Sequence, residues 1–328
     1  MAKYIIGIDQ STQGTKVMLF DEKGSPMLRL DRAHRQIIDE RGWVEHDPGE
    51  IYANLIALVK ELLDRSGIDG ADVAAAGISN QRETTLAWDR GTGKPVYNAV
   101  VWQCARGEAI CRRLEQEHPE LVQLVHERTG LRHSPYFSAP KLAWILENVP
   151  GVRENAEQGK VCCGTVDSYL VFRLTHGASF LTDYSNASRT ELFNIMDLRW
   201  DEEICGIFGI PTGCLPALMD SDGCFGYTDF EGVLPHAVPI HGVMGDSHAA
   251  LFGQGCLQRG QMKATYGTGS SIMMNIGEEP VLSTAGIVTS LAWKTRGRVQ
   301  YVFEGNINYT GAVISWLKND VHLIGSAG

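Results

Sequence analysis

The chain has 328 residues, 44% of them hydrophobic, and a formal net charge of −10, so we expect about two domains with hydrophobic cores. Nucleic acid is excluded as a partner, because its surface would need clustered Lys and Arg side chains and the sequence has no such cluster. We expect neither a membrane span nor a leader peptide, since the sequence has no run of about 18 apolar residues and no charged-then-apolar start.

Residues 3–20 predict a β-hairpin. An apolar run over 4–8 leads to Asp9, a turn of small polar residues follows, and a second apolar run covers 17–20. A turn rich in Ser, Thr and Gly can direct several backbone N–H groups at one point and so bind an anion. Asp9 beside this turn would suit a hydrated Mg²⁺ carried by a nucleotide phosphate. The alternative is an ordinary hairpin with a solvated tip.

The next elements predict a mixed sheet flanked by helices. A third strand is expected over 26–30, and a helix begins after Asp47, with Pro48 in its first turn and Gly67 at its end. Residues 73–79 are small and apolar, as in a strand that helices cover on both faces. This order of elements indicates an α/β protein.

Polar residues follow two of the predicted strands. Arg82 and Glu83 come directly after the small apolar strand, and a donor beside an acceptor can hold adjacent hydroxyls of a polyol. A second hairpin turns at 89–93 and returns over 96–101 to Trp102, which would offer an apolar wall to the C–H face of a sugar. The alternatives are a solvated turn with a surface ion pair, and core packing for the Trp side chain.

The middle of the chain predicts helices. Residues 105–149 form three helical pieces, and Tyr136 stands just before the third. Residues 165–174 predict a further amphipathic helix, and the polar stretch 182–190 is either a site loop or a generic one. The apolar face of the third piece consists of Leu142, Ile145 and Leu146.

A strand, Gly245, Asp246 and an Ala-rich helix follow one another over 239–253. The dipole at a helix N-terminus keeps a carboxylate ionised, as a base that activates a hydroxyl must be. The alternative is that Asp246 only caps the helix. His248 is expected to pack rather than to act in catalysis.

The opening pattern returns over 261–276 as strand, Gly/Thr/Ser turn and strand. Two such hairpins, each opening a sheet, predict a duplicated fold that binds a phosphate between its halves. We therefore divide the chain into a domain 1–254, with the sugar site and the first phosphate hairpin, and an incomplete domain 255–328. A further hairpin over 287–303 belongs to the second domain.

Together these stretches resemble the FGGY family of carbohydrate kinases, and among its members the glycerol kinases most. The resemblance implies the ribonuclease H-like fold of the actin/hexokinase/Hsp70 ATPase superfamily, with a mixed sheet flanked by helices. It also implies ATP-dependent phosphorylation of a terminal hydroxyl of a small polyol or ketose in the cytoplasm, where the eight scattered cysteines would stay reduced. The stretches that carry the resemblance are 80–84, 102–103, 136–148, 182–190, 245–254 and 265–269.

The resemblance also implies a role for each candidate residue. Asp246 would be the general base and, with Asp9, would hold Mg²⁺. The ATP phosphates would face two loops, which contain Thr12, Gln13 and Lys16, and Gly267, Thr268 and Gly269. The polyol site would be lined by Arg82, Glu83, Trp102, Tyr136, Asp246, Ser247 and Ser271. Such an inventory suits in-line phosphoryl transfer, which needs a metal, donors on the γ-phosphate and one base.

The sequence departs from the glycerol kinase pattern in three places, the first of which covers two residues. Cys104 and Ala105 stand where Asp-Arg follows the Trp-Gln pair, Ser247 replaces the Gln after the catalytic Asp, and Ser271 replaces a Phe that backs glycerol. The smaller side chains enlarge the pocket and add hydroxyls. We therefore expect a substrate longer than glycerol, such as a tetritol or a ketopentose like xylulose.

Members of this family are longer than the present chain, and their adenine-binding region lies beyond position 328. We therefore expect the chain alone to bind ATP weakly and to turn over little. Two other hypotheses stay open, namely a non-catalytic ATPase relative and a sugar-binding module without catalysis. The sugar constellation around Arg82 and Asp246 argues against a pure nucleotide switch. A homodimer is a further option for assembly.

Overall fold

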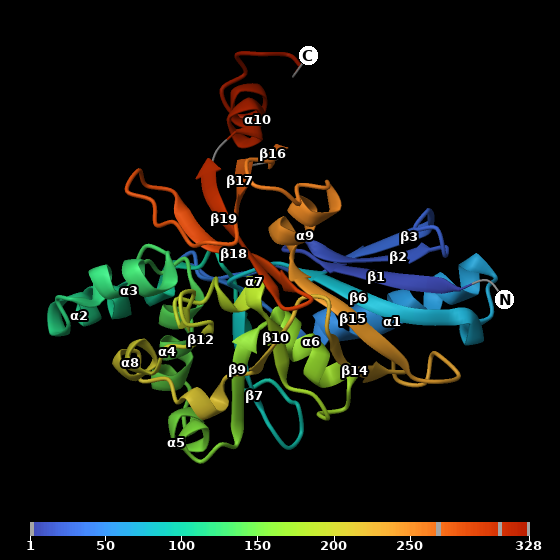
Figure 1. Ribbon diagram of the computed structural model, residues 1–328, viewed down its shortest axis with the longest axis horizontal. Coiled ribbons are helices and arrows are strands. Elements are labelled where there is room, and N and C mark those ends of the chain that lie inside the picture. The colour runs from blue at the N-terminus through green and yellow to red at the C-terminus, as the bar shows by residue number, and fades with distance from the viewer. Residues whose placement is uncertain (1–2, 267–269, 308–309, 327–328) are drawn as a thin grey trace.

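A six-stranded mixed sheet forms the centre of the N-terminal part of the protein (Figure 1). The computed structural model describes residues 3–266, 270–307 and 310–326. The strands of the sheet are β1 (Tyr4–Gln10), β2 (Gly14–Phe20), β3 (Pro26–Ala33), β6 (Val73–Asn80), β14 (Cys224–Thr228) and β15 (Val238–Gly245). They lie in the order β14-β15-β6-β1-β2-β3, with β1, β6 and β15 parallel to one another. The predicted opening hairpin and the third strand are thus confirmed.

The helix α1 (Pro48–Ser66) begins and ends where we predicted. The Asp47 side chain accepts hydrogen bonds from the backbone N–H groups of Gly49 and Glu50, which have no partner inside the helix. Gly67 ends the helix in the left-handed region, with φ of +69°. The apolar face of α1 joins the same buried cluster as the inward side chains of β1 and β2.

The helix α6 (Val166–Leu174) packs against this sheet but differs from our prediction. We expected an amphipathic helix, whereas nearly all its residues are buried. The reason is a second layer on its other side, where Tyr169 and Phe172 make edge contacts with the ring of Trp88. A helix held between two layers has no face left for solvent.

A second sheet with its own helices lies beside the first. Its strands are β4 (Ile37–Ile38), β5 (Val44–His46), β7 (Thr85–Asp89), β8 (Ala99–Val100) and β9 (Val161–Thr165), in the order β4-β5-β8-β7-β9. The return strand of the predicted second hairpin is therefore only two residues long, after the irregular chain that follows Pro95. The accompanying helices are α2 (Glu108–Glu117), α3 (Leu121–Thr129), α4 (Ser138–Asn148) and α5 (Val152–Glu157).

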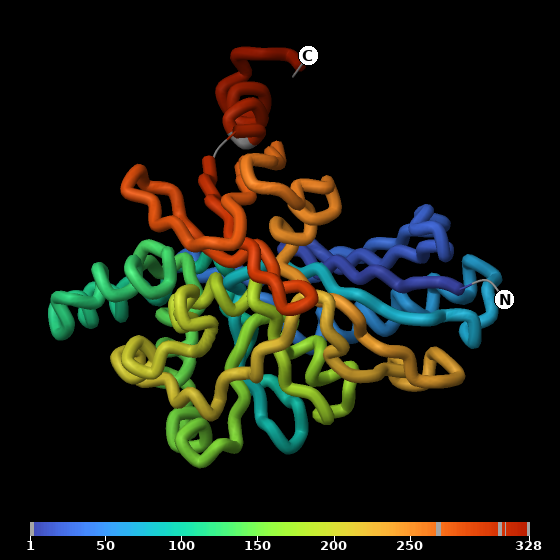
Figure 2. The backbone as a smooth tube through the Cα atoms, in the orientation of Figure 1, coloured from blue at the N-terminus to red at the C-terminus, as the bar shows by residue number. Residues whose placement is uncertain are grey.

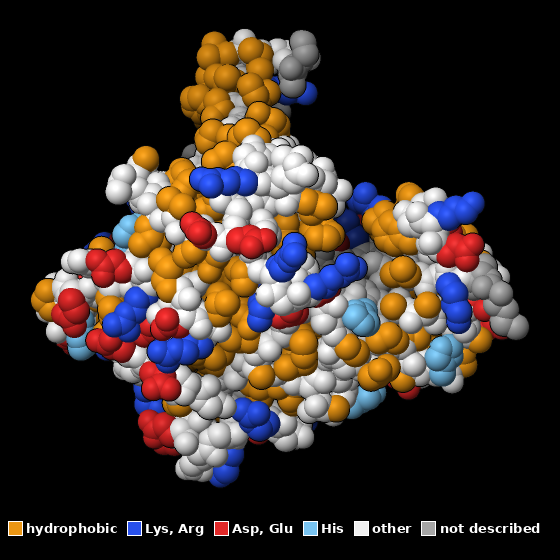
Figure 3. All heavy atoms as spheres, viewed as in Figure 1, with side chains coloured by type: hydrophobic (Ala, Val, Ile, Leu, Met, Phe, Trp, Pro, Cys, Tyr) orange, Lys and Arg blue, Asp and Glu red, His pale blue; other side chains and the backbone are white. Residues whose placement is uncertain are grey.

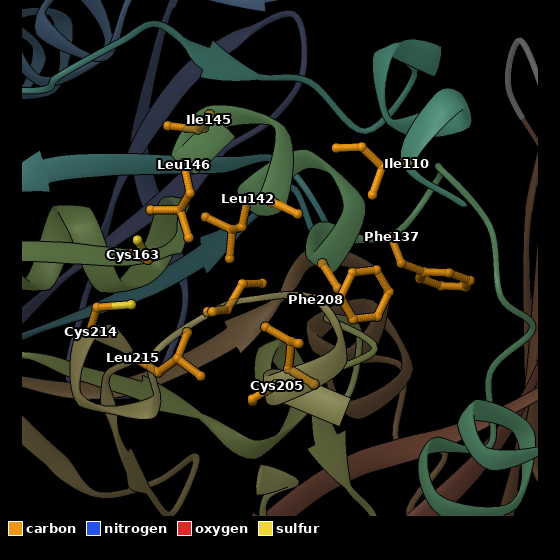
Figure 4. Packing of buried hydrophobic residues seen from close by; sticks show 14 of the residues in the cluster. Ile110, Phe137, Leu142, Ile145, Leu146, Cys163, Cys205, Phe208, Cys214 and Leu215 are labelled. Atoms are coloured by element: carbon orange, nitrogen blue, oxygen red, sulfur yellow. The ribbon is translucent and has the colours of Figure 1, made fainter. Parts of the chain in front are cut away.

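The core of this second layer confirms the apolar face that we predicted for α4. Leu142, Ile145 and Leu146 are buried in the cluster that also contains Cys163 and Phe208, and Figure 4 shows Leu142 and Leu146 extending from the helix toward its centre. Short elements complete the N-terminal part. They are β10 (Leu181–Asp183), α7 (Tyr184–Ala187), β11 (Phe193–Asn194), β12 (Arg199–Trp200), α8 (Glu202–Ile207), β13 (Ala217–Met219) and α9 (Asp246–Gly253).

A four-stranded antiparallel sheet forms the C-terminal part. Its strands are β16 (Met262–Tyr266), β17 (Ser270–Gly277), β18 (Val288–Thr295) and β19 (Arg298–Ile307), in the order β16-β17-β19-β18, and α10 (Gly311–Asn319) follows. Both hairpins that we predicted here are confirmed. The sheet lies against the segment that contains α7 (Figure 2), and the two share a buried cluster with Tyr184 and Tyr301.

Several hydrophobic side chains of α10 are exposed. This helix projects from the rest of the protein, and its hydrophobic side chains form one end of the molecule in Figure 3. Val313, Ile314 and Trp316 are each at least 41% exposed. Within the described ranges, no helix combines the length and the apolar character that crossing a membrane requires.

Candidate active site

The parallel strands of the central sheet bring the predicted site residues together. In the β1–β6 pairing Gln10 lies opposite Asn80, and in the β15–β6 pairing Gly245 lies opposite the same residue. The three strands therefore end at one level of the sheet edge, where ligand sites of α/β proteins commonly lie. The turn of the opening hairpin, the pair Arg82 and Glu83, and Asp246 each follow one of these ends.

Asp246 is the first residue of α9, and its carboxylate faces the guanidinium of Arg82. The distance from Asp246 Oδ1 to Arg82 Nε is 3.3 Å, and the Asp246 side chain is 40% exposed. The N-cap position belongs to Gly245, so the carboxylate is not the capping group of the alternative interpretation. Desolvation by the surrounding chain raises the pKa of Asp246 above its usual value, and the positive charge of Arg82 opposes the shift.

Gly245 makes the approach of Arg82 to Asp246 sterically feasible. A Cβ atom at position 245 would lie 2.7 Å from both Cγ and Cδ of Arg82. Real Cβ atoms essentially never come so close, so a larger residue would displace the arginine. The N–H of Gly245 donates to Ser185 Oγ at 2.9 Å, which anchors the end of β15 to α7.

Arg82 and Glu83 belong to a buried network of charges. Arg82 Nη1 and Nη2 both donate to Glu304 at 2.8 Å, and Arg189 Nη1 lies 3.1 Å from the same carboxylate. Arg189 Nε donates to Glu83 Oε1 at 2.6 Å. The side chains of all four residues are at most 6% exposed, so the solvated turn of the alternative interpretation is wrong.

Sequence reasoning missed two members of this network. Arg189 belongs to the polar stretch 182–190, for which we predicted no specific role. Glu304 ends an otherwise apolar run in β19. A lone carboxylate in an apolar strand is a usable signal, because a buried charge must find a partner. The sequence does not say which partner, since Glu304 and Arg82 are 222 positions apart.

Trp102 joins the candidate polyol wall to the first phosphate hairpin. Its indole N–H donates to Thr12 Oγ1 at 2.9 Å, and its ring meets that of Tyr136 edge-on, with the centroids 5.6 Å apart. The backbone carbonyl of Thr12 accepts a further bond from the Gln36 side chain at 2.9 Å. Trp102 is partly exposed and so is not the core residue of the alternative interpretation.

Asp9 and Lys16 face each other across the opening hairpin. Lys16 Nζ lies 2.7 Å from Asp9 Oδ2, and Ser79 Oγ donates to Asp9 Oδ1 at 3.2 Å. Both charged side chains are about one-third exposed, so a ligand can reach them. Gln13 is exposed at the tip of the same hairpin. The described residues contain no cluster of three or more His, Cys, Asp or Glu side chains positioned for a metal ion.

Three further candidates are placed as follows. Ser271 Oγ donates to Glu304 Oε1 at 3.4 Å, and the Ser247 N–H donates to Asp246 Oδ1 at 2.6 Å. Cys104 is buried and accepts a bond from Arg106. The second phosphate loop, Gly267, Thr268 and Gly269, lies outside the described residues, between the paired strands β16 and β17.

Comparison with known proteins decides the family. Residues 4–253 match the N-terminal domain of the FGGY family of carbohydrate kinases. The chain belongs to this family. Glycerol kinase 1 of Thermotoga maritima is 51% identical over 321 residues, and a glycerol kinase of Caldanaerobacter subterraneus subsp. tengcongensis is 46% identical over 327. The match covers 98% and 100% of this chain, which spans about 65% of the length of either relative.

Solved structures confirm the predicted fold. The structure of Plasmodium falciparum glycerol kinase with ADP superimposes with a TM-score of 0.92 at 36% identity, covering 99% of this chain and 65% of that one. A ligand-bound xylulose kinase from Lactobacillus acidophilus has a TM-score of 0.86 at 22% identity, covering 97% and 63%, and shows the fold alone. This FGGY chain therefore has the actin/hexokinase-like ATPase fold, with a mixed sheet and flanking helices.

Proposed function

We propose that this FGGY chain carries the polyol site and the first phosphate loop of an ATP-dependent kinase for a small polyol. One observation carries the proposal: Asp9 near the end of β1, Arg82 just after β6 and Asp246 directly after β15 lie at the aligned ends of three parallel strands. A carboxylate for the acceptor hydroxyl and a loop for the phosphates are thereby close together. The division into domains 1–254 and 255–328 is part of the same proposal.

Asp246 is the proposed general base. It accepts the proton of a terminal hydroxyl as the oxygen attacks the γ-phosphorus of ATP, and ADP leaves. Its raised pKa brings the carboxylate nearer to the pH at which a base is most effective. Arg82 keeps the carboxylate in place through the Nε contact at 3.3 Å.

The polyol is held by polar groups against an aromatic wall. Glu304 uses two of the five N–H groups of Arg82, so the Nε edge beside Asp246 can donate to a hydroxyl. Glu83 supplies an acceptor next to it. Trp102 and Tyr136 offer their rings to the C–H groups of the substrate.

Thr12, Gln13 and Lys16 are proposed to face the phosphates of ATP, together with Gly267, Thr268 and Gly269. Mg²⁺ fits this arrangement, because Asp9 is an accessible carboxylate beside a hydroxyl and Mg²⁺ commonly binds through one or two carboxylates, waters and substrate phosphates. Asp9 and Asp246 would hold it, and the ion would neutralise charge on the phosphates. Lys16 would then turn from Asp9 toward the phosphate oxygens.

Glycerol is the first substrate to test, since two glycerol kinases are 51% and 46% identical to this chain over nearly its whole length. A longer polyol or ketose, such as a tetritol or xylulose, is the second candidate. It is supported by Ser271, whose side chain is smaller than the Phe of the glycerol kinase pattern and whose hydroxyl donates to Glu304. A cytoplasmic location is proposed because all eight cysteines are free.

Single-turnover transfer tests the proposal. Excess protein is mixed with γ-labelled ATP, Mg²⁺ and glycerol, erythritol, xylulose, ribulose or xylitol, and labelled product is separated. Asp246→Asn should slow transfer by about 100-fold or more and leave polyol affinity largely unchanged. Asp69→Asn, a change at an exposed capping residue, is the control.

The possible results separate the hypotheses. Retained transfer in Asp246→Asn would exclude Asp246 as the base. Polyol binding without any labelled product would favour the sugar-binding module, and nucleotide binding alone would favour the non-catalytic ATPase. Slow transfer by 1–328 compared with longer relatives would agree with our expectation of little turnover.

A further inference from the structure

We propose that Glu304 is a positioning residue through which the C-terminal sheet orients Arg82 in the polyol site. This inference rests on the proposed function for the meaning of that site. Its geometric content, that Glu304 determines the orientation of the Arg82 guanidinium, is testable without any substrate.

Glu304 lies between two guanidinium groups and is completely buried. Arg82 donates two parallel hydrogen bonds of 2.8 Å to its two carboxylate oxygens, and Arg189 Nη1 approaches Oε2 at 3.1 Å. Parallel N–H···O bonds of this kind fix the plane of the guanidinium as well as its position. Burial alone would raise the pKa of Glu304, but Arg189 and Arg82 hold it well below its usual range. The carboxylate is thus charged and held from two sides.

This pairing decides which edge of Arg82 faces the substrate. Since Nη1 and Nη2 point to Glu304, Nε is left for Asp246 at 3.3 Å. Without the negative charge of Glu304, the buried guanidinium groups of Arg82 and Arg189 would repel each other, with little water between them to screen the charges. Arg82 would then be free to turn its fork to Asp246 and occupy the oxygens that a hydroxyl needs.

The residues of this network come from both parts of the protein. Arg82 follows β6 and Arg189 follows α7, whereas Glu304 belongs to β19 of the C-terminal sheet. The donor of the polyol site is therefore oriented by the other part of the molecule. Ser271, on the neighbouring strand β17, touches the same carboxylate at 3.4 Å. The position that we connect with substrate size thus contacts the group that orients Arg82.

Calorimetric titration of chain 1–328 with glycerol tests the effect on binding. Glu304→Gln removes the charge with little change of shape and should weaken glycerol binding about tenfold or more. Glu304→Asp keeps the charge and should recover much of the loss. Glu45→Gln breaks another carboxylate–guanidinium pair, with Arg106 at 2.6 Å, in the second sheet rather than in the Glu304 network, and should leave the affinity within about twofold. Wild-type affinity in a folded Glu304→Gln protein would overturn the proposal.

A spectroscopic measurement separates this inference from the proposed function. The Nε–H resonance of Arg82, assigned by its absence from Arg82→Lys protein, reports the orientation of the guanidinium directly. It should exchange slowly with solvent in wild-type, Glu304→Asp and Glu45→Gln proteins, and should shift and exchange faster in Glu304→Gln. If wild-type protein binds none of the polyols, the proposed function fails. The Arg82 Nε–H resonance then decides by itself whether Glu304 orients the guanidinium. An unchanged Arg82 signal in Glu304→Gln would refute the positioning role.

Discussion

At the scale of single residues, the absence of a side chain at Gly245 shapes the site. Gly245 has φ of −60°, which any residue can adopt, so backbone conformation does not require glycine here. The requirement is space, because Arg82 passes directly over this position. Arg82 has little freedom to move aside while both Nη atoms are bound to Glu304.

Gly245→Ala tests this close approach. The added methyl group should push Arg82 away from Asp246, lowering the free energy of unfolding by about 1–3 kcal/mol and glycerol affinity several-fold. Urea unfolding and calorimetry measure the two effects. Gly253→Ala is the matched control, since a Cβ there meets nothing within 4 Å. Equal behaviour of the two variants would contradict the steric argument.

Ser271→Phe tests whether position 271 sets substrate size. The ring would fill the space beside Glu304 and remove the hydroxyl contact at 3.4 Å. We expect the ratio of kcat/KM for glycerol to that for xylulose to rise by about tenfold, as is typical of one pocket contact. Ser271→Ala separates loss of the hydroxyl from gain of volume and should change the ratio much less. An unaltered ratio in Ser271→Phe would discredit the pocket-size argument.

At the scale of elements, buried charges hold the loop that leads into α4 and carries Tyr136. Lys141 is fully buried and donates to the backbone carbonyls of Pro135, Tyr136 and Phe137, while Glu191 Oε1 accepts from the Ser134 N–H at 2.8 Å. These contacts satisfy backbone groups that no strand or helix would satisfy. Tyr136 therefore stands on a loop fixed from two sides.

His133 and Glu191 form the second part of this support. The distance from His133 Nδ1 to Glu191 Oε2 is 3.2 Å, and both side chains are buried. Burial would lower the pKa of His133, but hydrogen bonds with Cys111 and Glu191 raise it to about 10. Burial raises the pKa of Glu191 as well. Both shifts mean that the folded protein binds protons more tightly than the unfolded chain.

The stabilising effect of this pair should therefore depend on pH. For His133 it is fully present below the unfolded pKa of about 6.5 and is lost as the pH rises toward 10. His133→Gln should lower the free energy of unfolding by roughly 3 kcal/mol at pH 6, and by clearly less at pH 9.5. Urea unfolding at both pH values measures this, with the exposed His118→Gln as control. A difference from wild type that does not change with pH would contradict the assignment.

At the scale of the whole molecule, two apolar clusters attach the C-terminal sheet to the N-terminal part. One contains Tyr184 and Tyr301, and the other contains Leu251 of α9 with Met273 of β17. The charged network around Glu304 lies where the same parts meet. Among the described residues, α10 does not contribute to these two clusters, and its side chains Val313, Ile314 and Trp316 are exposed at the end of the molecule (Figure 3).

The exposed apolar side chains of α10 should cause self-association of this chain. Val313, Ile314 and Trp316 are 41%, 41% and 54% exposed on different sides of one helix, and an apolar surface of this kind promotes association. We expect light scattering to give an apparent mass that rises with concentration and returns to the monomer value in Ile314→Ser/Trp316→Ser. Tyr227→Ser, at a side chain 62% exposed on β14, is the control. A wild-type chain that stays monomeric at high concentration would contradict the expectation.

Local chemistry explains which parts of the structure were predictable. Asp47, Pro48 and Gly67 delimit α1 through backbone preferences that act within a few residues. The opening hairpin and the sequence of strand, glycine, aspartate and helix at 245–246 are equally local. The helix predicted over 165–174 is confirmed as α6, but its expected exposed face is missing because its second buried side depends on Trp88, far away in the sequence. The short β8 differs for a similar reason, since its pairing depends on β5 and β7.

The sequence by itself determined the elements, the family and the candidate residues Asp9, Arg82 and Asp246, because turn chemistry and short motifs express themselves in neighbouring positions. Only the tertiary structure decided how those residues are held. Glu304 meets Arg82 across 222 positions, and Arg189 meets Glu83 across 106. An ion pair has no preferred separation along the chain. From the sequence alone, any Asp or Glu residue could therefore be the partner of Arg82. The packing of the C-terminal sheet against the N-terminal part brings Glu304 to the Arg82 guanidinium, which it binds through two hydrogen bonds.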